Sequence, residues 1–257
     1  MPLNLSDKVK TAAILAAGLG SRLKERTKLK PKGFLEIEGI SLIERSMQKL
    51  IDCGISHIVI GTGYLSNIYE DFALYFHQKH KDIKITCVRN PIFAETGSMY
   101  TLYLLKDTLK EDFLLLESDL LYDKKGLKLL IEDTTPDIIL ASGFTGSQDE
   151  VYIEFDEQQN LVNMSKKPEQ LKRLDAELVG ISKISYSTYL KMITFSEKLY
   201  KTSLQAHYED VFVGISRESK LFVKKVEDYA WCEIDDEQHL SRALSKILPI
   251  IKEKEGN

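Results

Sequence analysis

The first 145 residues alternate between short apolar runs and amphipathic segments. Apolar runs bounded by glycine or polar residues predict buried strands at 12–17, 57–60, 83–88, 113–116 and 138–140. The segments between them carry apolar residues at helical spacing, as in the helix that we predict to begin at Ser41 and to end at Gly54. Strands that alternate with helices favour a parallel sheet with helices on both faces, in which ligands bind at the carboxyl ends of the strands.

The pattern changes in the second part of the chain. Apolar and polar residues alternate over 151–155, which predicts a half-exposed strand, and 161–165 and 178–184 are further predicted strands. Further elements are predicted as helices at 186–200 and 207–217, a strand at 221–223, and a final helix with Leu240, Leu244, Ile247 and Ile250 facing inward. The sequence contains no internal repeat and no low-complexity linker, so we expect residues 1–257 to form one domain.

Composition and charge limit the cellular compartments and the classes of binding partner that can be expected. Of the 257 residues 43% are hydrophobic, which is enough for a sizeable core, and the net charge of −4 favours neither nucleic acid nor an anionic membrane as a partner. Cys53, Cys87 and Cys232 lie far apart without CxxC spacing, which indicates buried thiols in a reducing compartment. The N-terminus has no apolar signal core and no run reaches membrane-spanning length, so a cytoplasmic protein is expected.

The first predicted strand ends in the most distinctive motif of the chain. It reads Leu-Ala-Ala-Gly-Leu-Gly-Ser-Arg at 15–22 and is followed by Lys-Pro-Lys at 30–32. Backbone N–H groups of such a loop can surround phosphates, which the side chains of Arg22 and Lys32 would neutralise. A dinucleotide-binding fingerprint would need a glycine where Leu23 stands, and a Walker A loop would need a Gly-Lys-Ser/Thr sequence that does not occur. An ordinary strand and turn with surface charges is the remaining alternative.

The motif resembles the signature of nucleotidyltransferases. In length and motif order the chain is most similar to the small bacterial cytidylyltransferases that act on phosphocholine or 2-aminoethylphosphonate. The further residues that carry the resemblance are Gly63-Tyr64, Asp119, Tyr208 with Asp210, and Glu233-Ile234-Asp235. The resemblance implies a three-layer α/β/α Rossmann-like fold with a mainly parallel mixed sheet. It divides the single domain into a nucleotide-binding half at 10–145 and an acceptor-binding half at 146–257 that includes the C-terminal helix.

The same resemblance implies the reaction and its partners. A CTP-dependent enzyme of this kind transfers CMP to a small phosphonate or phosphate acceptor with Mg²⁺ as cofactor, and involves neither nucleic acid nor membrane. Whether the chain forms a homodimer is left open. A sugar-1-phosphate nucleotidyltransferase would share the first half but is usually longer. A catalytically silent regulator should lack the metal-binding aspartates or the signature lysine, whereas this chain keeps Asp119, Asp235 and Lys32.

Nucleotidyl transfer needs cations and metal-binding carboxylates but no covalent nucleophile. The predicted catalytic residues are Arg22, Lys32, Asp119 and Asp235. Asp119 and Asp235 each follow a predicted strand, and the resemblance makes both of them metal ligands. The alternatives are a turn-capping role for Asp119 and a helix N-cap for Asp235.

The nucleotide is expected to contact the glycine-rich loop and the loops after the second and third strands. The predicted contacts are Leu15, Ala16, Ala17, Gly18, Gly20, Ser21, Gly63, Thr96, Gly97, Ser98 and Glu117. The small residues permit close backbone approach, and Thr96 or Ser98 can meet the polar edge of a pyrimidine.

The acceptor is expected to bind in the second half. The predicted contacts are Glu150, Tyr152, Lys166, Tyr208, Glu209 and Asp210. Lys166 would hold the oxygens on phosphorus, and a polar turn is its alternative role. Val151 and Glu209 stand where the similar phosphocholine enzymes carry tryptophans. Carboxylates suit a primary ammonium and an aromatic cage suits choline, so 2-aminoethylphosphonate is favoured.

Phosphocholine stays open as the acceptor. Aromatic residues that could form a cage remain in the second half, namely Tyr152, Tyr208, Tyr229 and Trp231. Glu150 and Glu209 also have a plain alternative role as surface acids.

Overall fold

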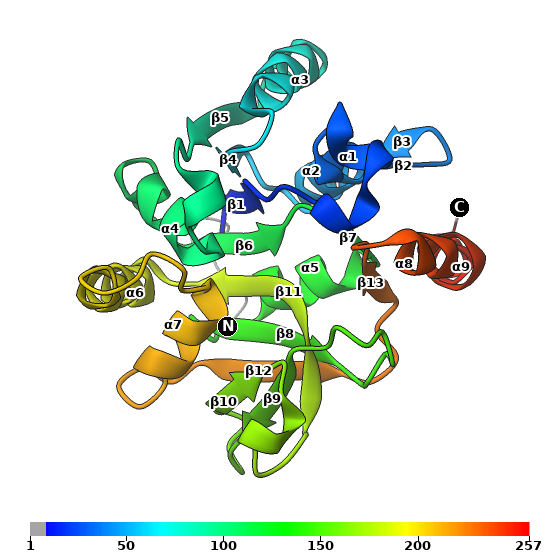
Figure 1. Ribbon diagram of the computed structural model, residues 1–257. Helices are drawn as coiled ribbons and strands as arrows, with labels where there is room; N and C mark the ends of the chain where they lie inside the picture. Colours follow the sequence, from blue (N-terminus) through cyan, green and yellow to red (C-terminus); the bar gives the residue numbers. More distant parts are fainter. Residues whose placement is uncertain (1–8, 257) are drawn as a thin grey trace.

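The computed structural model describes residues 9–256, and a nine-stranded mixed sheet forms the centre of this part of the chain (Figure 1). The main path of the sheet runs β5-β4-β1-β6-β11-β8-β12. These strands are β1 (Thr11–Ala16), β4 (His57–Thr62), β5 (Lys84–Arg89), β6 (Phe113–Glu117), β8 (Ile138–Ser142), β11 (Ala176–Ile184) and β12 (Phe222–Val226). All neighbours on this path are parallel except at β11, which is antiparallel to both β6 and β8.

One edge of β11 pairs with two different strands in succession. Ile181–Ile184 pair with β6, whereas Ala176 and Glu177 pair with β9 (Tyr152–Phe155), which is itself paired with β10 (Leu161–Ser165). Residues 178–180 lie between the two pairings. The sheet therefore divides at this point, and the division separates the end of β6 from the beginning of β9.

Helices cover both faces of the sheet, so a hydrophobic core lies on each face. The side chains of β1 alternate between these two cores. Ala13 and Leu15 pack with α4 (Ser98–Leu104), α6 (Tyr186–Leu199) and α7 (Tyr208–Ile215). Ala12 and Ile14 pack with α2 (Leu42–Asp52), α3 (Ser66–Lys79) and α5 (Lys125–Glu132). In Figure 1 α4, α6 and α7 lie on the left of the view, and α2 lies on its right. The predicted three-layer fold with a mainly parallel mixed sheet is confirmed.

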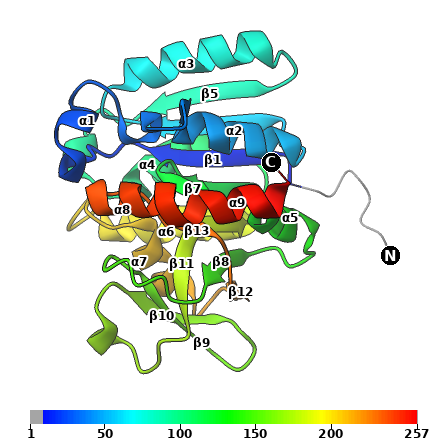
Figure 2. The same cartoon turned by 90° about the vertical axis from the view of Figure 1, so that its right-hand side faces the viewer.

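A third, smaller core holds the C-terminal helices against the rest of the molecule. α8 (Glu237–Arg242) and α9 (Leu248–Glu255) follow one another along one side, as Figure 2 shows. They pack near the short ladder of β7 (Leu120–Tyr122) and β13 (Trp231–Glu233). A short helix α1 (Glu25–Lys28) and a hairpin of β2 (Glu36–Ile37) and β3 (Ile40–Ser41) follow the glycine-rich loop.

The predicted inward face of the last helix is wrong in two positions. Leu244 is 45% exposed and Ile250 is 40% exposed, whereas the neighbouring Ala243 and Ile251 are buried. A π-helical turn over Ala243–Ile247 separates α8 from α9. The buried positions Leu240, Ala243, Ile247 and Ile251 are three or four residues apart, so the face that packs into the third core contains the alanine and not Leu244.

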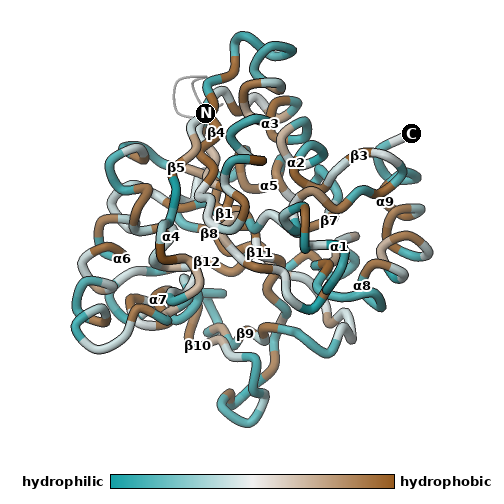
Figure 3. The backbone as a smooth tube through the Cα atoms, turned by 45° about the horizontal axis from the view of Figure 1, so that its top comes forward, coloured by the Kyte–Doolittle hydropathy of each residue, from teal (hydrophilic) through white to brown (hydrophobic). Residues whose placement is uncertain are grey.

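Hydrophobic residues gather along the central strands and hydrophilic residues along the outer loops (Figure 3). All three cysteines are free thiols, but Cys53 and Cys87 are partly exposed, so the expectation of burial holds for Cys232 only. Within residues 9–256, no helix combines the length and the hydropathy needed to span a bilayer.

Candidate active site

A cavity of about 760 Å³ opens at the carboxyl ends of β1 and β6 and continues along residues 178–180 of β11. This is the position at which the topology of an open α/β sheet places ligands. The predicted site residues that line the cavity are Leu15, Ala17, Gly18, Lys32, Thr96, Gly97, Ser98, Glu117, Asp119, Lys166, Glu209 and Asp210. Residues from both halves of the chain thus meet at one cavity.

The remaining predicted residues lie behind or beside the lining. They are Ala16, Gly20, Ser21, Arg22, Gly63, Glu150, Tyr152, Tyr208 and Asp235. Gly63 has a packing role, because a Cβ there would come within 2.8 Å of the carbonyl oxygen of Ala17. Arg22 and Asp235 reach the lining through ion pairs that are described below.

The glycine-rich loop turns sharply at Gly20, and the side chain of Leu23 then packs into the third core. Gly20 has a φ of +62°, and a Cβ on it would lie 3.2 Å from Cβ of Lys32, so glycine lets the loop and the lysine lie close together. Gly18 faces open space, with no neighbouring heavy atom within 4 Å of a Cβ built there. Leu23 is buried in the third core. The position at which a dinucleotide fingerprint needs glycine therefore serves packing.

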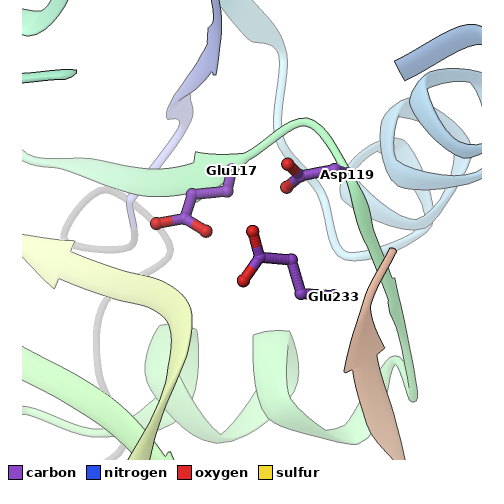
Figure 4. A group of neighbouring side chains, drawn as sticks. All are labelled: Glu117, Asp119 and Glu233. Atoms are coloured by element: carbon purple, nitrogen blue, oxygen red, sulfur yellow. The ribbon is translucent and has the colours of Figure 1, made fainter. Parts of the chain in front are cut away.

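Four charged side chains meet where β7 and β13 pair. The backbone N–H of Ile234 donates to the carbonyl of Asp119 at 3.1 Å, which brings the two acidic segments together. Between them, Nζ of Lys32 donates to Oδ2 of Asp119 at 2.5 Å and to Oδ1 of Asp235, and lies 3.5 Å from Glu233. Figure 4 shows Asp119 and Glu233 directed toward each other and toward Glu117.

A second group of acids lies between this cluster and α7. The hydroxyl of Tyr208, which is buried, donates to Oε1 of Glu117 at 2.5 Å. Glu209 lines the cavity, and its Oε2 is buried without a hydrogen-bond partner. Gly180 has a φ of +80°, and a Cβ there would lie only 2.9 Å from Oε2 of Glu117. Glycine at this point of β11 therefore leaves the space that the Glu117 carboxylate occupies.

The predicted hydroxyl contacts to the base already have partners within the protein. Oγ1 of Thr96 accepts from Nδ2 of Asn90 at 2.9 Å, and Oγ of Ser98 accepts from the backbone N–H of Tyr208 at 3.2 Å. A hydroxyl has one donor and two acceptor positions, so each retains capacity for a further hydrogen bond. Their predicted role at the pyrimidine edge stays a prediction.

The predicted acceptor residues are only partly brought together. Lys166 and Glu209 line the cavity, whereas Glu150 and Tyr152 do not. Asp210 lines it as well, but its carboxylate accepts the backbone N–H of His207 at 2.8 Å and so caps α7. Tyr208 lies behind the surface, where it orients Glu117.

Similarity to known proteins agrees with this geometry. Residues 12–153, which are more than half of the chain, match the sequence profile described as the MobA-like NTP transferase domain. The chain belongs to this family. The structure of the inositol-1-phosphate CTP transferase from T. maritima has the same fold, with a TM-score of 0.80 over 96% of this chain and 97% of that one at 21% identity.

Several relatives of this nucleotidyltransferase are named as cytidylyltransferases. The CTP:phosphoglutamine cytidylyltransferase of Campylobacter jejuni is 25% identical over 87% of this chain and 95% of that protein. The choline-phosphate cytidylyltransferase of Streptococcus pneumoniae is 26% identical over 92% and 97%. The 2-aminoethylphosphonate cytidylyltransferase of Lancefieldella rimae is 24% identical over 90% of each chain. The predicted family and the predicted class of enzyme, a nucleotidyltransferase, are confirmed.

The acids of this nucleotidyltransferase fit a divalent metal ion. Two groups among the described residues have carboxylate oxygens within 4.8 Å of one another, namely Glu117 with Asp119 and Glu233, and Asp149 with Glu233 and Asp235. Oδ1 of Asp119 and Oδ2 of Asp235 are both buried without a hydrogen-bond partner. Hard cations such as Mg²⁺ are bound by such oxygens together with phosphate oxygens. Asp119, Asp235 and Glu233 are therefore the residues that would hold the metal.

Electrostatics divides the acids into two kinds. Burial disfavours the charged form of Lys32, but Asp119, Glu233 and Asp235 outweigh it and raise its pKa. Burial alone would raise the pKa of Asp235, but Lys32 and a hydrogen bond with Glu233 lower it, so Asp235 is a stable anion. Burial and neighbouring carboxylates raise the pKa of both Glu117 and Glu233. Without a cation nearby, these two glutamates thus favour the neutral form, and a bound cation would favour their ionised form.

Two acids of the possible metal-binding groups were missing from the predicted site residues. Glu233 belongs to both acidic groups, and the Glu-Ile-Asp motif together with strand alternation could have placed it on the same face as Asp235. Asp149 lies in an irregular loop, and no local pattern points to it.

Proposed function

We propose that this nucleotidyltransferase transfers CMP from CTP to 2-aminoethylphosphonate with release of pyrophosphate. The observation that carries the proposal is that one cavity is lined both by a cation, Lys166, and by the acids Glu117 and Glu209. A short acceptor with an anionic phosphonate and a cationic amine matches such a charge distribution. Relatives named as cytidylyltransferases support CTP as the donor.

The unpartnered oxygen of Glu209 favours a primary amine. Oε2 of Glu209 is buried and lacks a hydrogen-bond donor. Leaving such an atom without a donor costs about 1–3 kcal/mol, and an –NH₃⁺ group supplies three donors. Choline supplies none. The neighbouring Glu117, whose pKa is raised, would also be stabilised as an anion by an ammonium ion.

In the proposed mechanism the cations of the site bind oxygens on phosphorus in both substrates. Arg22 and Lys32 bind phosphate oxygens and offset the charge on the transferring group. The phosphonate oxygen of the acceptor, held by Lys166, attacks the α-phosphorus of CTP. The new P–O bond forms as the bond to the β-phosphate oxygen breaks, and pyrophosphate leaves with that electron pair. Mg²⁺ bound by Asp119, Asp235 and Glu233 would supply further charge neutralisation.

Phosphocholine is the second candidate acceptor. Trp231 lines the cavity, and an indole face can bind a quaternary ammonium. The choline-phosphate enzyme of Streptococcus pneumoniae is as similar to this chain as the aminoethylphosphonate enzyme of Lancefieldella rimae. Among the other aromatic residues that might complete a cage, Tyr208 and Tyr229 are buried and Tyr152 lies outside the lining.

The proposal is tested by pyrophosphate release with each of the four NTPs and 2-aminoethylphosphonate, followed by mass analysis of the product. CTP should be preferred, and the product should be the cytidylyl conjugate of the phosphonate. Glu209→Gln should raise KM for the acceptor by about tenfold, since it removes the ion pair with the amine, and leave KM for CTP unchanged. Glu218→Gln, at an exposed position just past α7, is the matched control. Equal turnover with ATP or GTP, or an unchanged acceptor KM in Glu209→Gln, would contradict the proposal.

A further inference from the structure

The carboxylate of Asp149 joins two cations that belong to different halves of the chain. Asp149 lies in the loop between β8 and β9. Its Oδ2 accepts from Nη1 of Arg22 at 2.7 Å, and its Oδ1 accepts from Nζ of Lys166 at 2.7 Å. Arg22 belongs to the glycine-rich loop, whereas Lys166 directly follows β10. One carboxylate therefore links a cation of each half.

The two cations are available for exchange with a ligand. Their side chains are 54% and 55% exposed, whereas the side chain of Asp149 between them is 20% exposed. Arg22 also pairs through Nη2 with Oδ1 of Asp235 at 2.7 Å, so it stays attached to the acidic cluster when it changes its other partner. A carboxylate and a phosphate offer the same arrangement of two acceptor oxygens to such cations.

The loop that carries Asp149 is tethered at two residues that precede the aspartate. The backbone N–H of Thr145 donates to Glu177 at 2.6 Å, and the carbonyl of Ser147 lies 3.1 Å from Nε2 of His239. These contacts do not involve Arg22 or Lys166. The carboxylate can therefore leave both cations while the loop keeps its place beside the cavity.

We propose that Asp149 is a built-in competitor for phosphate. In the ligand-free enzyme its carboxylate occupies the position between Arg22 and Lys166 that oxygens on phosphorus take during the reaction, those of the nucleotide at Arg22 and those of the acceptor at Lys166. Binding of these oxygens displaces it. The proposal rests on the binding of oxygens on phosphorus by Arg22 and Lys166, as the proposed function has it, and is independent of the base of the nucleotide and of the amine of the acceptor.

A role of Asp149 as a metal ligand predicts a different effect of its neutralisation on ligand binding. Its carboxylate also lies with those of Glu233 and Asp235 in a group whose oxygens are within 4.8 Å of one another. If Asp149 acted as a metal ligand, then its neutralisation would weaken the binding of the metal and would not strengthen the binding of a phosphate compound.

Calorimetric titration with inorganic pyrophosphate in EDTA tests the proposal, because no metal, CTP or acceptor is present. Asp149→Asn removes the competing charge while keeping the size of the side chain, so pyrophosphate should bind about five- to tenfold more tightly than to the parent protein. In a Lys166→Gln background the same substitution should have a smaller effect, because one of the two cations is missing. Asp82→Asn, at an exposed position outside the cavity, is the matched control and should leave the affinity unchanged.

Unchanged or weaker binding of pyrophosphate to Asp149→Asn would overturn the proposal. So would a loss of Mn²⁺ affinity in Asp149→Asn without any gain for pyrophosphate, since that result identifies a metal ligand. Thermal unfolding of each variant checks that the fold is kept. A failure of the proposed acceptor would leave these binding results as they are, so the two proposals can fail separately.

Discussion

At the scale of single residues, Lys32 is the cation that stabilises the acidic cluster in the absence of a ligand. Its side chain is largely buried, as are those of Asp119 and Asp235. Removing one partner of a buried ion pair leaves the other charge without compensation. The ammonium group therefore keeps two carboxylates close together that would otherwise repel each other. The same closeness is what a divalent cation requires.

Asp119→Asn and Asp235→Asn should each lower turnover by a factor of about 10² or more, because each removes one of the carboxylates that fit the metal. Asp235→Asn should also reduce the free energy of unfolding by about 1–3 kcal/mol, since its carboxylate is the more buried partner of Lys32. Turnover at saturating Mg²⁺ and urea unfolding measure the two effects, with Asp82→Asn as control. Near-parental turnover in both variants would show that the metal is bound elsewhere.

The stability of the metal-free protein should fall as the pH rises above 5. The pKa of Glu233 is raised in the folded state, so the folded protein holds a proton there that the unfolded chain releases near its ordinary pKa. One such group changes the free energy of unfolding by up to about 1.4 kcal/mol per pH unit until the pH reaches the raised pKa. Urea unfolding in EDTA at pH 5 and pH 8 should show a smaller decline for Glu233→Gln. Equal declines in parent and variant would exclude Glu233 as the cause.

At the scale of secondary structure, local patterns account for what could be predicted. The strands at 57–60 and 113–116 were found because parallel strands buried on both faces form continuous apolar runs. The π-helical turn at Ala243–Ile247 could not be found in this way, because one residue more or less in a turn leaves the apolar spacing nearly unchanged. Asp149 was missed for a related reason, since the partners of a loop residue depend on contacts distant in sequence.

Gly180→Ala should disturb the active site from within a strand. The substitution introduces a Cβ at a φ of +80° and 2.9 Å from the Glu117 carboxylate. Gly39→Ala is a matched control, because Gly39 has a φ of +76° but open space around its Cβ position. We expect Gly180→Ala to lose about 1 kcal/mol more stability than Gly39→Ala and to raise the acceptor KM. Equal losses with an unchanged KM would mean that Glu117 moves aside without consequence.

At the scale of the whole molecule, the division of the sheet at β11 leaves room for the active-site cavity. The end of β6 delivers Glu117, and the segment just after it delivers Asp119. The strands beyond the division bring Lys166, and β13 brings Glu233. The sequence predicted most of these residues from a motif and from strand ends. It could not predict that Tyr208 would orient Glu117, or that Glu150 would lie outside the lining, because both depend on how the halves meet.

The central claim is that this cavity accepts a short zwitterion with a primary amine, and kcat/KM with CTP for 2-aminoethylphosphonate against phosphocholine tests it most directly. A site whose buried carboxylates need hydrogen-bond donors should reject the trimethylated amine, so we predict a preference for 2-aminoethylphosphonate of about a hundredfold or more. Equal values, or a preference for phosphocholine, would contradict the account.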